Sequence, residues 1–587
     1  MTNSVQEPTD EPVEQPGPPA EPTEPASSGT EATSSSIAPR VFYPAAAVIV
    51  VFVAVALLAP DATSSTIGKV QSFVIDDLGW YYVLLVAVFV LFSLFAAFGP
   101  WASIRLGPQN EPAEFSMRSW LAMLFSAGMG IGLVFWGVAE PLNHLAAPKP
   151  GVSGTQPEIA HAAMNQTYLH WGVHAWGIYV VVGLAIAYAV HRRGRPVSIR
   201  WALEGLLGRR LTAGPLGDVI DVIAIVGTLF GVATSLGFGV VQLSAGLGYL
   251  ELAPDAASTR VVAVCLITGL ATLSVVTGLT KGIQWLSNAN MLLAGAVLLF
   301  VLIAGPTVFL LREFVASIGH YLAGVLELTF DTTPLQGEEG RAWQAAWTTF
   351  YWGWWISWAP FVGVFIARIS RGRTVREFVT GVLAVPTLLT FLWFSVLGGS
   401  AIYRELFGSG GLIGDDGSVS TNDSLFALLG GLPLGTVVSL VALALIVTFF
   451  VTSSDSGSLV VDMLASGGDP NPPTWSRIFW AVAEGLVALA LLVIGGNAAL
   501  GALQTTAIVI ALPFSIVMIG MMVALSRSLN ADSRRIAEIR RRERTAAVAE
   551  HVRASLDHDA QGRALAVRKD RTPMGVTPGR GPSREHG

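Results

Sequence analysis

The chain has 587 residues, of which 52% are hydrophobic and 13% charged, and its formal net charge is −6. So few charges over such a length exclude an ordinary soluble domain, and we expect no nucleic-acid partner. Crossing a hydrocarbon core of about 30 Å takes about 20 apolar residues in a helix. Runs of that length recur through the middle of the chain.

We count about twelve such runs and predict an all-α membrane protein, because barrel strands would instead alternate polar and apolar residues. The expected spans lie approximately at residues 42–59, 80–98, 117–139, 163–190, 217–249, 260–279, 284–311, 345–369, 379–402, 434–463, 475–494 and 499–525.

The distribution of charge predicts the orientation of these spans. Residues 1–39 hold seven acids and no base, and their prolines prevent regular structure, so we expect a disordered tail over 1–40. Cytoplasmic loops carry an excess of Lys and Arg, which predicts that both termini face the cytoplasm. The bases follow even-numbered spans, as at Arg192, Arg193, Arg195, Arg368, Arg371 and Arg373. The acids follow odd-numbered spans, as at Asp61, Asp76, Asp77, Glu140, Glu251 and Asp415.

The third expected span contains glycines at alternate positions, Gly128, Gly130 and Gly132. Each weakens a helix by roughly 1 kcal/mol, so this pattern predicts a break in the middle of the membrane. In a transporter, the freed carbonyls can bind a cation and the broken end can face a carboxylate. The alternative is close helix packing of the GxxxG kind.

Tryptophan is concentrated in the eighth span, where Trp355 and Trp358 fall near the midpoint and Trp354 shares a face with Trp358. An indole N–H is unfavourable there unless it faces protein or a cavity. Several such rings can form a cage for a quaternary ammonium group, worth about 0.5 to 2 kcal/mol per ring. An aromatic packing core is the alternative.

The fourth span adds Trp171, Trp176 and Tyr179 on one side of a helix, where they could complete the cage. Anchoring at the membrane interface is the alternative for the two tryptophans. His170 and His174 flank Trp171, but the sequence offers no third ligand that would make them a metal site.

Hydroxyls fill part of the tenth span, which reads Thr-Ser-Ser-Asp-Ser over residues 452–456. Such hard oxygen ligands suit sodium, whereas isolated hydroxyls often bond back to their own helix. Asp221 and Glu484 also lie in apolar runs, and a buried ion pair, a water-lined cavity or the nearby interface could each explain them.

A basic stretch follows the last span, with Arg534, Arg535, Arg540, Arg541, Arg542, Arg544 and Arg553. We expect Asp532 or Ser533 to begin a separate helix there that runs towards Leu556. The charges could simply anchor the chain, or they could sense anionic lipid.

Several longer motifs resemble the betaine/choline/carnitine transporters, and among them the osmoregulated sodium/glycine betaine symporters. The resemblance rests on GMGIGLVFWGVAEP at 128–141, HWGVHAWGIY at 170–179, TLFGVATSLGFG at 228–239 and WTTFYWGWWISWAPFVGVFIARISRGR at 347–373. It implies a LeuT-type core of two inverted five-helix repeats and a homotrimer. The implied parts are two accessory helices at 41–116, the first repeat at 117–311, an amphipathic helix (about 312–327) and loop at 312–344, the second repeat at 345–525 and a basic tail at 526–587.

The same resemblance implies roles for particular residues. Trp171, Trp176, Tyr179 and Trp355 would hold a trimethylammonium group beside the glycine stretch, and Trp354, Trp358 and Ser235 would line the route inward. One sodium would bind at the backbone of Ser126 and Met129 and the side chains of Thr452 and Ser453. A second sodium site keeps Thr228 and Phe361 but has Val232 in place of a threonine, which argues against two coupled ions.

Gly132 helps to separate the substrates, because proton-coupled choline transporters that resemble this motif place an aspartate there. A neutral residue at this position favours a zwitterionic substrate.

We therefore expect a sodium-coupled importer of glycine betaine or a similar solute in the cytoplasmic membrane. Sodium is the expected coupling ion, no other cofactor is expected, and osmotic activation is a hypothesis. The alternatives are a sodium-independent exchanger of the carnitine type, a proton-coupled choline importer and a passive osmotic channel. Catalytic signatures such as HExxH and GxSxG are absent, so we expect no enzyme.

Overall fold

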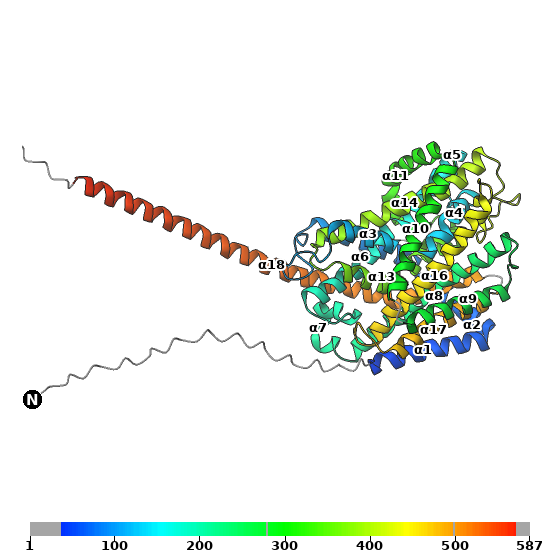
Figure 1. Ribbon diagram of the computed structural model, residues 1–587, viewed down its shortest axis with the longest axis horizontal. Helices are drawn as coiled ribbons and strands as arrows, with labels where there is room; N and C mark the ends of the chain where they lie inside the picture. Colours follow the sequence, from blue (N-terminus) through cyan, green and yellow to red (C-terminus); the bar gives the residue numbers. More distant parts are fainter. Residues whose placement is uncertain (1–36, 129, 278–279, 497–498, 571–587) are drawn as a thin grey trace, which may run out of the picture.

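The computed structural model describes residues 37–128, 130–277, 280–496 and 499–570. In this part of the chain the secondary structure is helical, and the β-structure consists of isolated bridges such as Arg105 with Thr374. The helices pack side by side in one bundle, and a single long helix projects from one end of it (Figure 1). The predicted all-α fold is confirmed.

Helices of the first half of the chain are α1 (Pro39–Leu58), α2 (Pro60–Phe98), α3 (Met117–Gly128), α4 (Ile131–Ala146), α5 (Gln156–Trp171), α6 (Val173–Ala187), η1 (Tyr188–Arg192), η2 (Ile199–Leu203), α7 (Glu204–Thr212), α8 (Pro215–Tyr249) and α9 (Ala257–Thr277). Those of the second half are α10 (Thr280–Ala304), α11 (Thr307–Phe330), α12 (Gly337–Gln344), η3 (Ala345–Thr349), α13 (Phe350–Ile369), α14 (Val375–Phe407), α15 (Ser424–Gly430), α16 (Gly435–Ala465), α17 (Thr474–Gly495) and α18 (Ala499–Asp570).

Among the described residues, 11 helices are long and apolar enough to cross a membrane, so the protein is a multi-pass membrane protein. The expected third span is not one of them, because it is divided between α3 and α4. The expected eighth span, α13, is also missing from this set, since indoles and Pro360 lower its hydropathy. The pairing of the helices into two inverted repeats stays a prediction.

Three expected boundaries were wrong. Helix α2 begins at Pro60, so the predicted connection before residue 80 is helical, and proline suits that first position because its missing N–H is not needed there. The seventh span ends at Ala304. The connecting helix α11 then runs over Thr307–Phe330, which is long enough to count among the 11 candidate spans.

The basic tail does not form a helix of its own. Helix α18 is continuous over 72 residues, so Asp532 and Ser533 lie in its interior and cap nothing. Neither glycine nor proline occurs between Gly520 and Gly562, and the Ala, Arg and Glu that fill this stretch are strong helix formers. The last span therefore runs directly into the helix that projects from the bundle in Figure 1.

Helix α13 lies at the centre of the bundle, against α6, α8 and α18. Its contact with α6 is close because Gly363 faces Val182 and Gly183. A Cβ atom added at Gly363 would lie 2.6 Å from Val182 Cγ1. This close approach brings the aromatic residues near the α5–α6 junction against those of α13.

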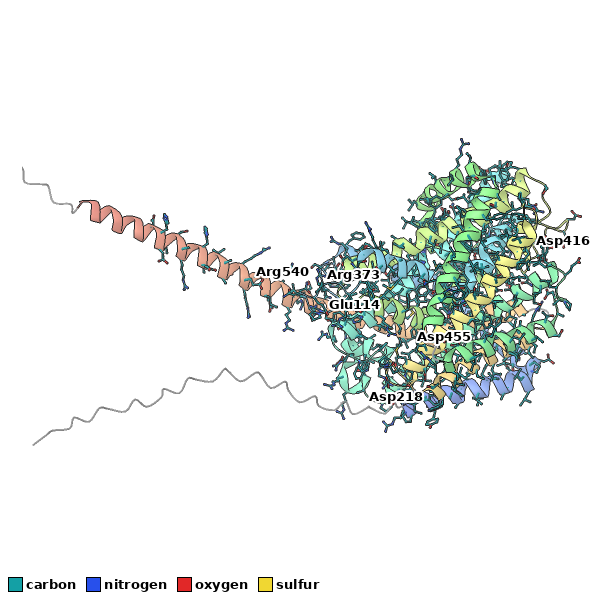
Figure 2. The ribbon with its side chains drawn as sticks, viewed as in Figure 1. Glu114, Asp218, Arg373, Asp416, Asp455 and Arg540 are labelled. Atoms are coloured by element: carbon teal, nitrogen blue, oxygen red, sulfur yellow. The ribbon has the colours of Figure 1, made fainter. Side chains whose placement is uncertain are left out.

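Charged residues mark the two ends of the bundle. Arg373 lies at the end from which α18 projects with Arg540, whereas Asp416 lies at the opposite end (Figure 2). Glu114 and Asp218 lie at the same end as Arg373, so the sign of charge does not by itself divide the two ends, and the assignment of the basic end to the cytoplasm stays a prediction.

Candidate functional site

The glycine-rich segment interrupts a helix, as predicted. Helix α3 ends at Gly128 and α4 begins at Ile131, with Gly130 in an extended conformation between them. Met129 lies outside the described residues. The first N–H groups of α4 have no partner within their own helix, so the break presents a positive helix end next to Gly132.

The aromatic residues expected to bind substrate meet at this break. They line one cavity with Gly130, Gly132 and Ser235, so the predicted substrate residues whose surroundings the structure describes face the same space, and those of Gly128 lie outside this description. The lining consists of Gly130, Ile131, Gly132, Leu133, Trp171, Ala175, Trp176, Tyr179, Ser235, Trp354, Trp355, Trp358, Thr390 and Ser453.

The rings form a continuous cluster, which we call the aromatic cage (Trp171, Trp176, Tyr179, Trp354 and Trp355). Trp354 and Trp355 stack with their centroids 4.4 Å apart, and Trp171 stands edge-on to Trp355 at 4.9 Å. Tyr179 approaches Trp355 at 6.3 Å and Trp176 at 5.3 Å. The cavity between them is only ≈ 40 Å³, so the rings lie almost in contact.

Two polar groups that line the cavity have no hydrogen-bond partner among the described residues, the hydroxyl of Tyr179 and the indole Nε1 of Trp358. A third group is satisfied, because Trp354 Nε1 donates to Ser235 Oγ at 3.1 Å. The cavity therefore combines aromatic faces, which attract a cation, with unpaired donors and a helix N-terminus, which attract an anion.

A second cavity of ≈ 240 Å³ contains the side chains expected at sodium. Ser126 at the end of α3 lines it together with Thr452 and Ser453 of α16. Ser453 and Trp358 also line the aromatic cage, so the two cavities share part of their walls.

Asn290 of α10 is a residue of this second cavity that the sequence did not single out. Its Nδ2 donates to Thr452 Oγ1 at 2.8 Å, while its Oδ1 is buried and has no hydrogen-bond partner in the part of the chain that the structure describes. Thr452 in turn donates to Thr448 O at 3.0 Å, so its hydroxyl is held in place within its own helix. An oxygen without a partner beside two hydroxyls is a suitable addition to a sodium site.

The two residues kept from a second sodium site, Thr228 and Phe361, are not brought together by a described cavity. Phe361 lines the second cavity and packs against Trp358 at 5.4 Å. Thr228 is fully buried in α8, its hydroxyl has no described partner, and it lines neither cavity.

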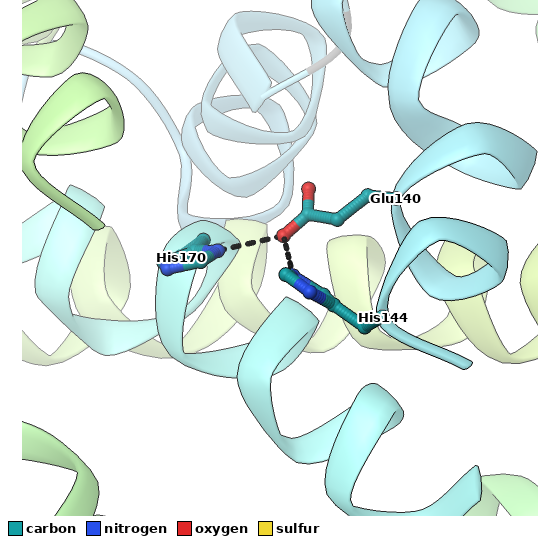
Figure 3. Close-up of side chains that lie close together, drawn as sticks. All are labelled: Glu140, His144 and His170. Atoms are coloured by element: carbon teal, nitrogen blue, oxygen red, sulfur yellow. Dashed lines mark hydrogen bonds and ion pairs between the residues drawn. The ribbon is translucent and has the colours of Figure 1, made fainter. Parts of the chain in front are cut away.

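Glu140 was expected in an extracellular connection, and that prediction was wrong. Helix α4 continues past Pro141 to Ala146, so the carboxylate is buried inside the bundle. It accepts a hydrogen bond from Trp171 Nε1 at 2.6 Å and another from the hydroxyl of Tyr351. His144 and His170 lie beside it (Figure 3).

The two histidines near Trp171 have different partners. His170 Nδ1 lies 2.7 Å from Glu140 Oε1, while His174 Nε2 lies 2.8 Å from Thr329 Oγ1. His170 therefore does have two further candidate ligands beside it, Glu140 and His144, which the sequence did not reveal.

The two unassigned acids also differ. Asp221 is buried and forms an ion pair with Arg200 at 2.5 Å, which selects the ion-pair explanation. Glu484 is buried too, but accepts only from Ser454 Oγ at 3.1 Å, and its other oxygen has no described partner.

Comparison with known proteins finds transporters that resemble most of the chain. The model of the betaine/carnitine/choline family transporters matches residues 40–534. An uncharacterized transporter of Mycobacterium tuberculosis is 51% identical over 499 residues, which are 85% of this chain and 83% of that protein.

Two further relatives are named for substrates. The glycine betaine transporter OpuD of Bacillus subtilis is 46% identical over 480 residues, covering 82% of this chain and 92% of that protein. The high-affinity choline transport protein of Escherichia coli is 39% identical over 502 residues, covering 85% of this chain and 73% of that protein.

Proposed function

The chain belongs to the betaine/carnitine/choline transporter family, and we propose that it is a sodium-coupled importer of glycine betaine or a similar quaternary-ammonium zwitterion. Membership of this family makes it a transporter rather than an enzyme. One observation carries the choice of substrate class, namely that a single cavity joins the aromatic cage to the N-terminus of α4.

The two parts of this cavity suit the two charges of a zwitterion. A trimethylammonium group has no hydrogen to donate and prefers aromatic faces, which Trp171, Trp176, Tyr179 and Trp355 provide. A carboxylate would be stabilised by the first N–H groups of α4 and by Trp358 Nε1.

Gly132 favours a zwitterion over a net cation. A Cβ atom there would lie 2.6 Å from Trp354 and 3.0 Å from Trp171, so the cage has no room for an acidic side chain at this position. No carboxylate lines the cavity among the described residues, and a substrate without its own negative charge would leave the cage with an unbalanced cation.

The cage would have to open to accept this substrate. The space between the rings is small, and Trp171 and Trp355 are in contact with their centroids 4.9 Å apart, which leaves no room for a trimethylammonium group between these two rings. We propose that Trp354 and Trp355 separate from Trp171 when substrate arrives and close over it afterwards, as in other gated transporters.

Sodium is proposed at Ser126, Thr452 and Ser453, with Met129 as predicted from sequence and Asn290 Oδ1 as an additional oxygen. An ion there would couple to substrate because Ser453 and Trp358 border both cavities. A single sodium is favoured, since Thr228 lines neither cavity.

The remaining proposals concern the surroundings of the protein. We propose a homotrimer in the cytoplasmic membrane with both termini inside, where the arginines of α18 beyond the last span can meet anionic lipid and respond to osmotic stress. Each exposed arginine close to such a surface is worth about 1 kcal/mol.

The decisive experiment is uptake of radiolabelled glycine betaine into proteoliposomes, with and without an inward sodium gradient and at several external osmolalities. Accumulation that requires sodium is the expected result. Transport that requires internal substrate instead of sodium would assign the protein to the carnitine-type exchangers. Transport of choline driven by protons would assign it to the choline importers, and equilibration without accumulation would indicate a passive channel.

A further inference from the structure

Glu140 lies behind the aromatic cage rather than in it. The residue is fully buried, and it does not line the substrate cavity. Its carboxylate instead touches Trp171, whose other end faces that cavity. This arrangement gives Glu140 contact with the substrate site through one ring.

Several donors converge on this carboxylate. Trp171 Nε1 and the Tyr351 hydroxyl both donate to Oε2, and His170 Nδ1 lies 2.7 Å from Oε1. The Gln166 amide nitrogen lies 2.9 Å from His170 Nε2, and an amide nitrogen can only donate. His170 therefore carries its hydrogen on Nδ1 and donates it to Glu140.

Both ends of the Trp171 indole are fixed by one helix, α4. Glu140 accepts from its pyrrole nitrogen at 2.6 Å, and Gly132 provides the space for its benzene ring, since a Cβ there would lie 3.0 Å from Trp171 Cη2. Thr390 Oγ1 fixes the backbone by donating to Trp171 O at 3.1 Å.

A second cage ring is tied to the same cluster. Trp355 Nε1 donates to the backbone oxygen of His170 at 2.9 Å, and His170 is held by Glu140. Tyr351 stacks on Trp355 with centroids 5.9 Å apart and donates to Glu140. Glu140 thus joins α4, α5 and α13 where they surround the cage.

A metal ion fits this cluster poorly. Glu140, His144 and His170 are close enough to share an ion, but both carboxylate oxygens already accept from N–H or O–H groups. An ion would have to displace the hydrogen of His170, which Gln166 holds in place from the other side. The arrangement is that of an acceptor with its donors.

We propose that Glu140 is a positioning residue of the cage: by accepting hydrogen bonds from Trp171 and Tyr351, it holds the Trp171 ring in the orientation that a quaternary ammonium group requires. The identity of the ligand in this inference rests on the proposed function, whereas the hydrogen bonds of Glu140 do not depend on it. A ring free to rotate would offer the cation its edge, which is the positive part of the ring, as often as its face.

The test is a double-mutant cycle on glycine betaine affinity, measured with the purified full-length protein. The variants are Glu140→Gln, Trp171→Phe and the two combined, since phenylalanine keeps a ring but loses the N–H. Glu140→Gln should weaken binding about tenfold, the range of one cation–π contact. Trp171→Phe should then add little, because the glutamine amide has one acceptor oxygen and an NH2 donor, so it cannot accept from Trp171, Tyr351 and His170 together and no longer holds the indole N–H firmly. Glu140→Asp, which keeps a carboxylate, should restore part of the affinity.

Trp176→Phe is the matched control, because Trp176 lines the same cavity but makes no described bond to Glu140. In the double variant, the fold-losses of affinity caused by Trp176→Phe and Glu140→Gln should multiply, as expected for independent sites. If the Trp171 and Glu140 effects also multiply, or if Glu140→Gln leaves affinity unchanged, Glu140 does not position the cage.

A second cycle with the same variants uses the thermal midpoint of the ligand-free protein. Coupling between Glu140 and Trp171, but not between Glu140 and Trp176, is expected there too. Should Glu140→Gln fail to fold, Tyr351→Phe replaces it in both cycles, because it removes another hydrogen bond to the same carboxylate. If wild-type protein binds no betaine, the proposed function fails, while the ligand-free cycle still decides the role of Glu140.

Discussion

Asp532 of α18 forms an ion pair with Arg192 at the end of η1, where the fourth span leaves the bundle. Tyr188 strengthens this contact by donating to Asp532 Oδ2 at 3.1 Å, and Arg192 also donates to the backbone oxygen of Gly107 at 2.8 Å. The projecting helix is therefore attached to the bundle at its base by side chains, in addition to the continuous backbone.

Asp532→Asn should loosen this attachment. Both partners are partly exposed, so the pair is worth about 0.2 to 1 kcal/mol, and trypsin should cleave after Arg534 and Arg535 about 1.4- to fivefold faster. Limited proteolysis in detergent measures this. Ser533→Ala is the control, because it removes only one long, exposed contact to Pro100 O. Equal cleavage of the two variants would show that the pair does not hold the helix.

Gly132→Ala should weaken glycine betaine binding about tenfold or more, because the added methyl group must displace the rings of Trp354 and Trp171. Gly130→Ala should have a smaller effect, since the nearest atom to its Cβ would be 3.9 Å away, on Trp358. Binding assays on both variants test this, and a loss that is larger at Gly130 would contradict the geometry.

Trp355→Leu should raise the KM for glycine betaine at least about tenfold with little change in maximal rate, because it removes a central ring of the cage. Uptake kinetics in proteoliposomes measure both quantities. Trp285→Leu is the control, since that indole is 70% exposed on the outside of the bundle. An unchanged KM for Trp355→Leu would place the substrate elsewhere.

Thr452→Val should raise the sodium concentration for half-maximal uptake about tenfold, because valine keeps the shape but supplies no oxygen. Thr448→Val lies one turn earlier in α16, lines neither cavity and should leave that concentration nearly unchanged. Uptake at graded sodium distinguishes them. If the two variants behave alike, Thr452 is not a sodium ligand.

Asp221→Asn should lower the thermal midpoint, because it leaves the Arg200 guanidinium without its fully buried partner. Breaking such a buried pair costs about 3 to 5 kcal/mol of stability. The loss should be smaller here, because Arg200 keeps its second ion pair, with Asp218. Asp218→Asn should have a smaller effect, since Asp218 is 16% exposed against 0% for Asp221. A thermal unfolding series on the two variants tests the order.

The cage residues could be predicted from sequence because tryptophan in mid-membrane is unusual in itself. The break between α3 and α4 followed from glycine spacing in the same way. Glu140 and Asn290 could not be predicted, because their importance depends on which helices pack beside them. A single Glu near the end of an apolar run looks like an interface residue until Trp171 and Tyr351 are placed against it.

The boundaries of α2, α11 and α18 were missed for a related reason. Hydropathy marks where a helix enters the hydrocarbon, but not where its backbone stops being helical. Helix α18 leaves the apolar region and continues through a charged sequence that keeps a high helix propensity.

Trp358 and Ser453 border both cavities, so the two compartments are separated by a single layer of side chains. A thin partition of this kind cannot move towards one compartment without enlarging the other. Filling the larger compartment would thus compress the smaller one. Binding in one compartment would then change the free energy of binding in the other through one indole and one hydroxyl, with no long chain of intermediates.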